Sequence, residues 1–143
     1  MRKTIVVLIG VVVIAGIVLV VGWPYVRLEF ASSAYYTEQD KRAYEYYTPE
    51  LLKKIPRISD DYKFEFGRIT GTEANVFTMK FYGVSETRSI RNYLKSEGYE
   101  LQASCDVEAE CWESRATNDE VTVGNIHSQK GVFVQIYRRL YSN

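Results

Sequence analysis

The sequence of 143 residues contains little of what enzyme and cofactor sites are usually built from. It has a single histidine, His127, and no glycine pattern of the kind that exposes a nucleophilic serine or cradles a phosphate group. It also lacks a calcium-loop pattern, and two cysteines with one histidine offer few ligands for a metal. We therefore expect no catalytic, cofactor-binding or metal-binding residues and predict that the protein is not an enzyme.

Residues 28–143 also carry no excess of positive charge. Three of the 18 basic residues, Arg2, Lys3 and Arg27, lie in the first 27 positions, so residues 28–143 hold 15 basic residues against 18 acidic ones. Nucleic-acid-binding domains usually carry a basic patch and a positive net charge. A net charge of −3 in this part of the chain therefore argues against a nucleic acid as its partner.

Charge is absent altogether from Thr4 to Gly22. As a helix, such a run spans about 28 Å, close to the ~30 Å hydrocarbon core of a bilayer. A cleaved secretory signal has a shorter apolar region, about 7–15 residues, that leads to a small-residue cleavage site. This run instead ends at Trp23 and Pro24, and no cysteine follows it for a lipid anchor. We predict a retained transmembrane helix over 4–22 within a membrane anchor, 1–27.

The residues that flank the apolar run predict its orientation. Basic residues beside a membrane helix favour the cytoplasmic side, and Arg2 and Lys3 outnumber Arg27. The prediction is a single-pass protein of the inner (cytoplasmic) membrane with its N-terminus in the cytoplasm. Residues 28–143 are of a size for one globular domain, which then lies in the periplasm.

Three helices are predicted after the anchor. Helical spacing of apolar residues, with a pattern resembling a capping box at its start, indicates a helix over 37–47. Thr48 and Pro49 begin a short second helix that ends at Pro56. Ser85 caps the third, which ends at Gly98.

Alternating apolar and polar residues predict the strands. Two of them, around 62–66 and 77–81, would form a hairpin through the segment 68–74. Further strands are expected over 99–105, from 111, over 120–125 and over 132–137. Strands with helices inserted irregularly between them indicate an α+β fold. The predicted chain is thus one N-terminal transmembrane helix followed by a small domain with a mainly antiparallel sheet and two to three helices.

The two cysteines, Cys105 and Cys111, are predicted to form a disulfide bond. An even pair at short spacing is typical of an oxidising compartment, and closing this loop is worth about 2.4 kcal/mol in the chain-entropy model. Two buried free thiols are the alternative.

Acidic residues gather on and next to the hairpin that this bond would pin. A rigid acidic protrusion suits a basic partner, because complementary charge speeds association and a pinned loop loses little entropy on binding. The alternative is a hairpin tip that is simply made soluble by its charge. The candidate partner-binding residues are Asp106, Glu108, Glu110 and Glu113, with Asp119 and Glu120 on the following turn.

Tyrosine is abundant, and 11 of the 12 tyrosines lie in the predicted domain, five of them between Tyr35 and Tyr47. Tyrosines are common anchors of protein interfaces. The same spacing also fits packing of a helix onto the sheet, and we favour packing.

The predicted layout resembles that of membrane-anchored periplasmic immunity proteins, which neutralise a bacteriocin or a delivered toxin. It consists of a short cytoplasmic start, one anchor helix and a small disulfide-bearing domain. This resemblance is one of layout, so it assigns no roles to residues. It implies a periplasmic binding module whose partner is a protein, such as a basic toxin.

Two other classes of function remain open. An accessory subunit of a cell-envelope machine would use the anchor helix itself for contacts. A periplasmic hydrolase would need an indispensable carboxylate, such as one in the pair Asp60 and Asp61, or His127. Both aspartates precede a predicted strand and fit a polar loop.

The predicted orientation can be tested with a reporter that is active only outside the cytoplasm. Fused after Asn143, it should be active, because the Arg2 and Lys3 flank keeps the N-terminus inside. A cytoplasmic reporter at the same position should be silent. The opposite result would place the domain in the cytoplasm.

Overall fold

The computed structural model describes residues 1–71, 73–105 and 109–139, and it divides the chain into two compact units, Met1–Ala31 and Ser32–Asn143. The first unit is the helix α1 (Arg2–Phe30). Its stretch from Arg2 to Leu28 is long and apolar enough to cross a membrane. The helix continues through Pro24, where proline's missing N–H removes one intrahelical hydrogen bond, and thus extends beyond the apolar run 4–22.

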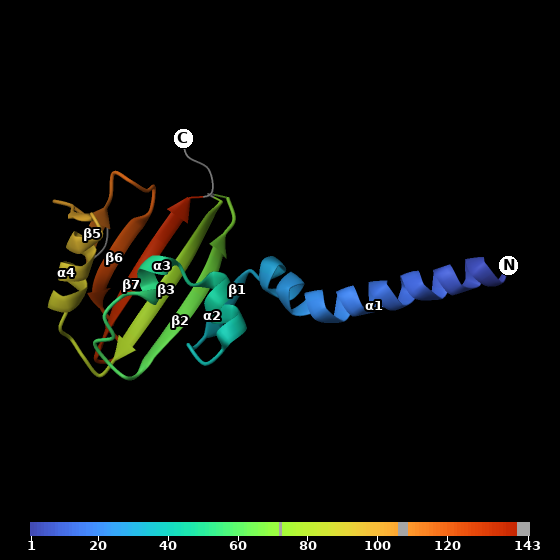
Figure 1. The fold of residues 1–143 in the computed structure, drawn as a ribbon. Helices are drawn as coiled ribbons and strands as arrows, with labels where there is room; N and C mark the ends of the chain where they lie inside the picture. Colours follow the sequence, from blue (N-terminus) through green and yellow to red (C-terminus); the bar gives the residue numbers. More distant parts are fainter. Residues whose placement is uncertain (72, 106–108, 140–143) are drawn as a thin grey trace. The chain divides into compact units, whose positions relative to one another are not determined.

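The second unit is built on one antiparallel sheet of seven strands, in the order β1-β2-β3-β7-β6-β5-β4 (Figure 1). It follows a long apolar helix and carries three further helices, so an α+β domain with a mainly antiparallel sheet is confirmed. The strands are β1 (Ser33–Tyr36), β2 (Tyr62–Ile69), β3 (Ala74–Tyr82), β4 (Glu100–Leu101), β5 (Glu110–Glu113), β6 (Glu120–Asn125) and β7 (Gly131–Arg139).

The helices α2 (Lys41–Tyr47), α3 (Glu50–Lys53) and α4 (Arg88–Ser96) lie on the same face of this sheet (Figure 1). We call that face the covered face and the opposite one the open face. Ile90 and Leu94 of α4 are fully buried, as is Leu52 of α3. The strands contribute their alternate apolar side chains to the same core: Phe64, Phe66, Phe77, Met79, Phe81, Trp112, Val121, Val123, Val132, Val134 and Ile136.

The tyrosines near the start of the domain help to attach α2 to the sheet. Tyr44 meets the ring of Phe64 edge-on at 5.3 Å between centroids, and Tyr47 stacks on Phe66 at 4.4 Å. Tyr36 stacks on Phe64 at 5.5 Å, and its hydroxyl shares a 2.8 Å hydrogen bond with Thr48. The packing interpretation is therefore correct for these three tyrosines.

Arg57 ties the ends of α2 and α3 to the sheet. Its guanidinium donates hydrogen bonds to the carbonyl oxygens of Leu52 at 2.9 Å and Lys53 at 3.1 Å, and to the Tyr44 hydroxyl at 3.3 Å. It also pairs with the Glu38 carboxylate at 3.4 Å. A planar guanidinium has five donors and can satisfy more acceptors at once than the three donors of a lysine.

Glu38 completes this junction from the turn before α2. Tyr62 of β2 donates its hydroxyl hydrogen to the Glu38 carboxylate. This hydrogen bond, together with the charge of Arg57, lowers the pKa of Glu38. The carboxylate therefore stays ionised, and paired with Arg57, to lower pH than an ordinary glutamate would.

Three predicted boundaries were wrong. The helix expected from Thr37 begins at Lys41, because Ser33–Tyr36 forms β1 and a turn follows, in which Asp40 N–H donates to the Thr37 carbonyl at 3.0 Å. Thr87, not Ser85, precedes α4. The strand expected over 99–105 is reduced to β4, since the chain then turns toward the disulfide.

Candidate functional site

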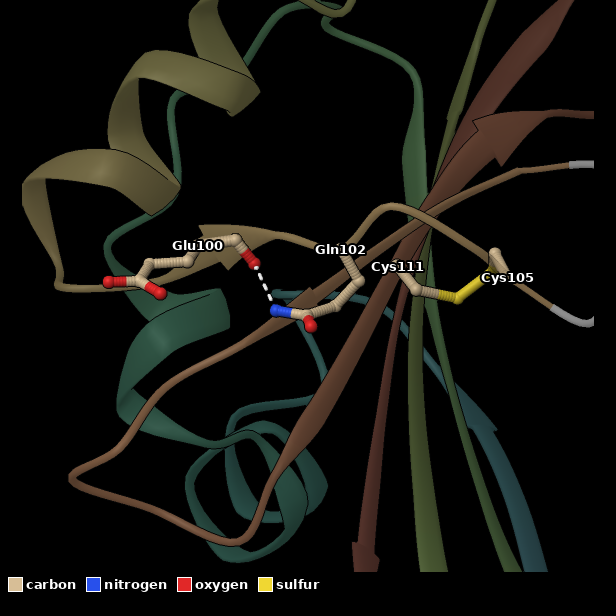
Figure 2. The surroundings of a disulfide bond; sticks show 4 residues. All are labelled: Glu100, Gln102, Cys105 and Cys111. Atoms are coloured by element: carbon tan, nitrogen blue, oxygen red, sulfur yellow. Dashed lines mark hydrogen bonds between the residues drawn. A yellow bond between two sulfur atoms is a disulfide. The ribbon is translucent and has the colours of Figure 1, made fainter.

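The disulfide between Cys105 and Cys111 is present, with 5.6 Å between the two Cα atoms. It joins the segment after β4 to β5, at the edge of the sheet farthest from β1. Next to it, the Gln102 amide donates a 3.0 Å hydrogen bond to the Glu100 carbonyl, while the Glu100 carboxylate points away from the disulfide (Figure 2). The bond thus ties the segment that follows β4 to the paired strand β5.

Four of the six predicted partner-binding residues are described, and they do not all lie on one face of the sheet. Asp106 and Glu108 lie outside the described residues. Glu110 stands opposite Val123 in the register, so it belongs to the covered face, where its carboxylate accepts a 2.7 Å hydrogen bond from Arg91 of α4. Its charge is already paired within the fold.

Asp119 is also engaged inside the domain. Both of its carboxylate oxygens accept hydrogen bonds from Arg138, at 3.0 and 2.9 Å, and its side chain is only 12 % exposed. This bidentate pair fastens the β5–β6 turn to β7 and raises the pKa of Arg138. Asp119 therefore has a structural role in this turn.

Among the described residues that were predicted, Glu113 and Glu120 are the two that the structure places side by side on one face, and Asp119 borders the hollow next to them. The two glutamates are direct cross-strand partners on β5 and β6, and they belong to the open face. Glu100 of β4 stands opposite Glu113 in the same way, although the sequence interpretation did not include it. The three residues form a line across three neighbouring strands, which we call the glutamate row.

Glu100 was not predicted because it is distant in sequence from the acidic segment 106–110 and becomes the neighbour of Glu113 only through strand pairing. A sequence signal for it exists, since it is the acidic residue of the short strand that leads into the disulfide loop. Finding it requires the register between β4 and β5, which a two-residue strand does not reveal.

Little positive charge balances the glutamate row. Glu120 has a distant ion pair with Arg139, at 3.9 Å, in which both side chains are about half exposed. In the part of the chain that the structure describes, no ion pair involves Glu100 or Glu113. Like charges directly opposite each other destabilise a sheet. The row is therefore unfavourable to the fold itself.

Two surface hollows adjoin the row, and Glu113 and Glu120 line both of them. One, of about 220 Å³, extends toward the β5–β6 turn and is bordered by Asn118 and Arg139. The other, of about 400 Å³, reaches the disulfide and Gln102. A lysine or arginine side chain that enters either hollow would meet the same two carboxylates.

The row does not have the geometry of a metal centre. Carboxylates that bind a metal converge on one point, whereas these three stand side by side along a line. Among the described residues, no group of three or more acidic, histidine or cysteine side chains is placed to hold a metal ion. An extended set of positive charges fits this arrangement better than a single cation.

A third hollow, of about 420 Å³, lies between α3, α4 and the β5–β6 turn. Tyr93 lines it and donates a 2.7 Å hydrogen bond to the Leu51 carbonyl, while burial raises the pKa of its phenol to about 12. Arg138, at its border, is already held by Asp119. Tyr93 and Arg138 are thus engaged within the fold, and we favour the glutamate row as the candidate site.

The two faces of β5 predict opposite effects for two neighbouring glutamates. Glu110→Gln should lower the free energy of unfolding by roughly 0.2–1 kcal/mol, because it weakens the ion pair with Arg91. Glu113→Gln should raise it by a similar amount, roughly 0.2–1 kcal/mol, because it relieves the repulsion from Glu100 and Glu120. Urea unfolding followed through the emission of the buried Trp112 measures both. Destabilisation by Glu113→Gln would contradict the row.

No protein-family model matches this chain, and comparisons with curated proteins and with solved structures return no match either. No function is therefore transferred from a relative, and a function has to be inferred from the described residues and their chemistry.

Proposed function

We propose that this protein is a membrane-anchored periplasmic binding module that captures a basic protein partner on its glutamate row. Most concretely, it is an immunity-type inhibitor that neutralises an incoming bacteriocin or secreted toxin. The observation that carries the proposal is the line of three carboxylates on neighbouring strands, two of which have no ion pair among the described residues.

The anchoring rests on α1. The apolar side chains of its uncharged stretch are exposed. An exposed apolar surface of this length requires a cover, and lipid hydrocarbon is the environment that its dimensions fit. Arg2 and Lys3 favour an N-terminus in the cytoplasm. The disulfide is in keeping with a domain in the oxidising periplasm.

Electrostatics supports a basic partner. Repulsion within the row is relieved when positive side chains from a second protein approach it, so the free energy lost in folding is recovered in binding. Positive partners are also attracted from a distance, which raises the association rate. A toxin must be intercepted before it reaches its target, and fast association is therefore the property an inhibitor needs.

Rigidity supports the same conclusion. The row lies on paired strands, and the adjacent loop is closed by a disulfide. Little conformational entropy remains to be lost when a partner binds to such a surface. The hollows on either side give positive side chains a place to enter.

The test uses the protein encoded beside this one, since toxins and their inhibitors are produced together. Replacing Glu100, Glu113 and Glu120 by lysine should slow association by about tenfold or more, within the range that electrostatic steering contributes. The difference should shrink at high salt because exposed charges are then screened. Stopped-flow or surface-plasmon measurements at two salt concentrations give both results.

The matched control replaces three exposed carboxylates that lie outside the row, Asp60, Asp61 and Glu73, by lysine. It makes the same change in net charge and should leave association within about threefold of the original. If both triple variants bind as fast as the unchanged protein, the row is not the binding surface. If both slow association equally, net charge alone is responsible.

The anchor distinguishes this function from a subunit of an envelope machine. An inhibitor should still protect cells when α1 is replaced by a cleavable signal, because the row is in the second unit. An assembly subunit that uses α1 for contacts should lose its function in the same experiment. Loss of protection with normal periplasmic levels of the domain would favour the second class.

A further inference from the structure

The two edges of the sheet are not alike. The edge at β4 is two residues long, carries a glutamate and is followed by the disulfide-closed loop. Short length and charge are the usual means by which proteins keep a sheet edge from pairing with other strands. The edge at β1 has the sequence Ser-Ala-Tyr-Tyr, with no charge and no proline.

The hydrogen-bond register shows which groups face outward from β1. Arg68 N–H donates to the Ser32 carbonyl at 2.8 Å, and Ser32 is followed by the pairs Ser33 with Gly67 and Ala34 with Phe66. In an antiparallel pair, alternate residues direct their N–H and C=O groups to the partner strand. Ser32, Ala34 and Tyr36 thus bond to β2, and Ser33 and Tyr35 direct theirs away from it.

The two residues that carry these outward groups lie at the surface. Ser33 is exposed and Tyr35 is 78 % exposed. Among the described strands, β1 pairs with β2 alone. The edge therefore presents two donors and two acceptors in the arrangement that another antiparallel strand requires.

We propose that the occupant of this edge is β1 of a second copy of this chain, paired antiparallel so that the two sheets become continuous. The symmetric register places Ala34 opposite Ala34 of the other copy. Each Ser33 then stands opposite a Tyr35, and the pair of strands forms four backbone hydrogen bonds.

The side chains fit this register. Ala34 directs its backbone groups to β2, so it has none left for Ala34 of the other copy. These two alanines, on the twofold axis, therefore form a non-hydrogen-bonded pair, whose Cα atoms are about 4.5 Å apart. This is the closest approach in an antiparallel pair, and alanine is small enough for it. On the open face, the ring of Tyr35 lies beside the small side chain of Ser33 from the other copy.

The membrane favours a second copy over other occupants. Only Ala31 and Ser32 lie between the end of α1 and β1, so the edge of every copy is held near its own anchor by a short tether. This step rests on the anchoring proposed above. Copies that share a membrane meet at an effective concentration far above that of free proteins, which allows a small interface to form.

Pairing at β1 leaves the proposed binding surface free. The glutamate row lies on β4, β5 and β6, on the other half of the sheet. The continuous sheet would carry one row near each outer edge. A paired protein is thus bivalent, although the row does not depend on pairing.

The test is disulfide cross-linking of the full-length chain in membranes under mild oxidation. Ala34→Cys should give a covalent dimer, because the two Cα atoms are within the limit of about 7 Å for a disulfide. Ser33→Cys is the matched control, since diagonal neighbours in this register are about 7–8 Å apart and should cross-link poorly. Equal cross-linking of both variants, or none with Ala34→Cys, overturns the proposal.

A second variant tests the hydrogen bonds. Tyr35→Pro, added to Ala34→Cys, removes an N–H that faces away from β2, and edge strands tolerate proline at such positions. Cross-linking should slow by roughly tenfold, the effect of losing two hydrogen bonds from the symmetric pair. Tyr35→Ala keeps the N–H and should cross-link faster than Tyr35→Pro. Equal rates for the two variants would contradict pairing through the backbone.

Membrane fractionation separates the two proposals. A chain that is in the membrane fraction but gives no Ala34→Cys dimer refutes pairing and leaves the anchoring intact. A chain absent from the membrane fraction overturns the anchoring. It also overturns the argument for pairing, which depends on the high effective concentration of copies in one membrane. Cross-links from Ala34→Cys to a different protein would mean that another strand occupies this edge.

Discussion

Strand alternation in the antiparallel sheet is the constraint on which the rest of this structure depends. Successive side chains point to opposite faces, so one register places the large apolar residues of the core against the helices and the residues between them on the open face. A shift of β5 by one residue would bring Glu113 into the core in place of Trp112. The burial of Trp112 therefore fixes the positions of Glu110 and Glu113 on opposite faces.

The layer of helices sets this register by covering one face. Arg57 joins α2 and α3 through its hydrogen bonds, and its guanidinium lies over the rings of Tyr62 and Phe64 of β2. Far from that junction, the disulfide holds the short strand β4 beside β5. A two-residue strand has little stability of its own, and the disulfide and a 2.8 Å hydrogen bond from Gln102 N–H to the Cys111 carbonyl extend its connection to β5.

Much of the fold can be predicted from sequence patterns. Alternation predicted the hairpin of β2 and β3, along with β6 and β7, because each of these strands has one apolar face long enough to be recognised. The disulfide was predictable from the short spacing between Cys105 and Cys111. In contrast, β1 was missed because its Tyr35 and Tyr36 were assigned to the region of the following helix, whose packing they resemble.

The candidate site was only partly predictable, for a similar reason. The sequence places acidic residues near one another along the chain, but not on the same face. Glu110 and Glu113 are three residues apart on one strand and therefore point to opposite sides. Glu100 joins Glu113 through a pairing between segments that the disulfide loop separates. Such long-range pairing is decided by packing and is not encoded in local composition.

The most direct test of the central claim is a double-mutant cycle of Glu113→Gln and Glu120→Gln, measured as free energies of unfolding. If the two carboxylates repel each other across β5 and β6, the double variant gains less stability than the sum of the single variants. Once one charge is gone, the other has nothing left to repel, and the coupling weakens at high salt. Effects that add within about 0.3 kcal/mol at low salt would contradict a glutamate row on this face.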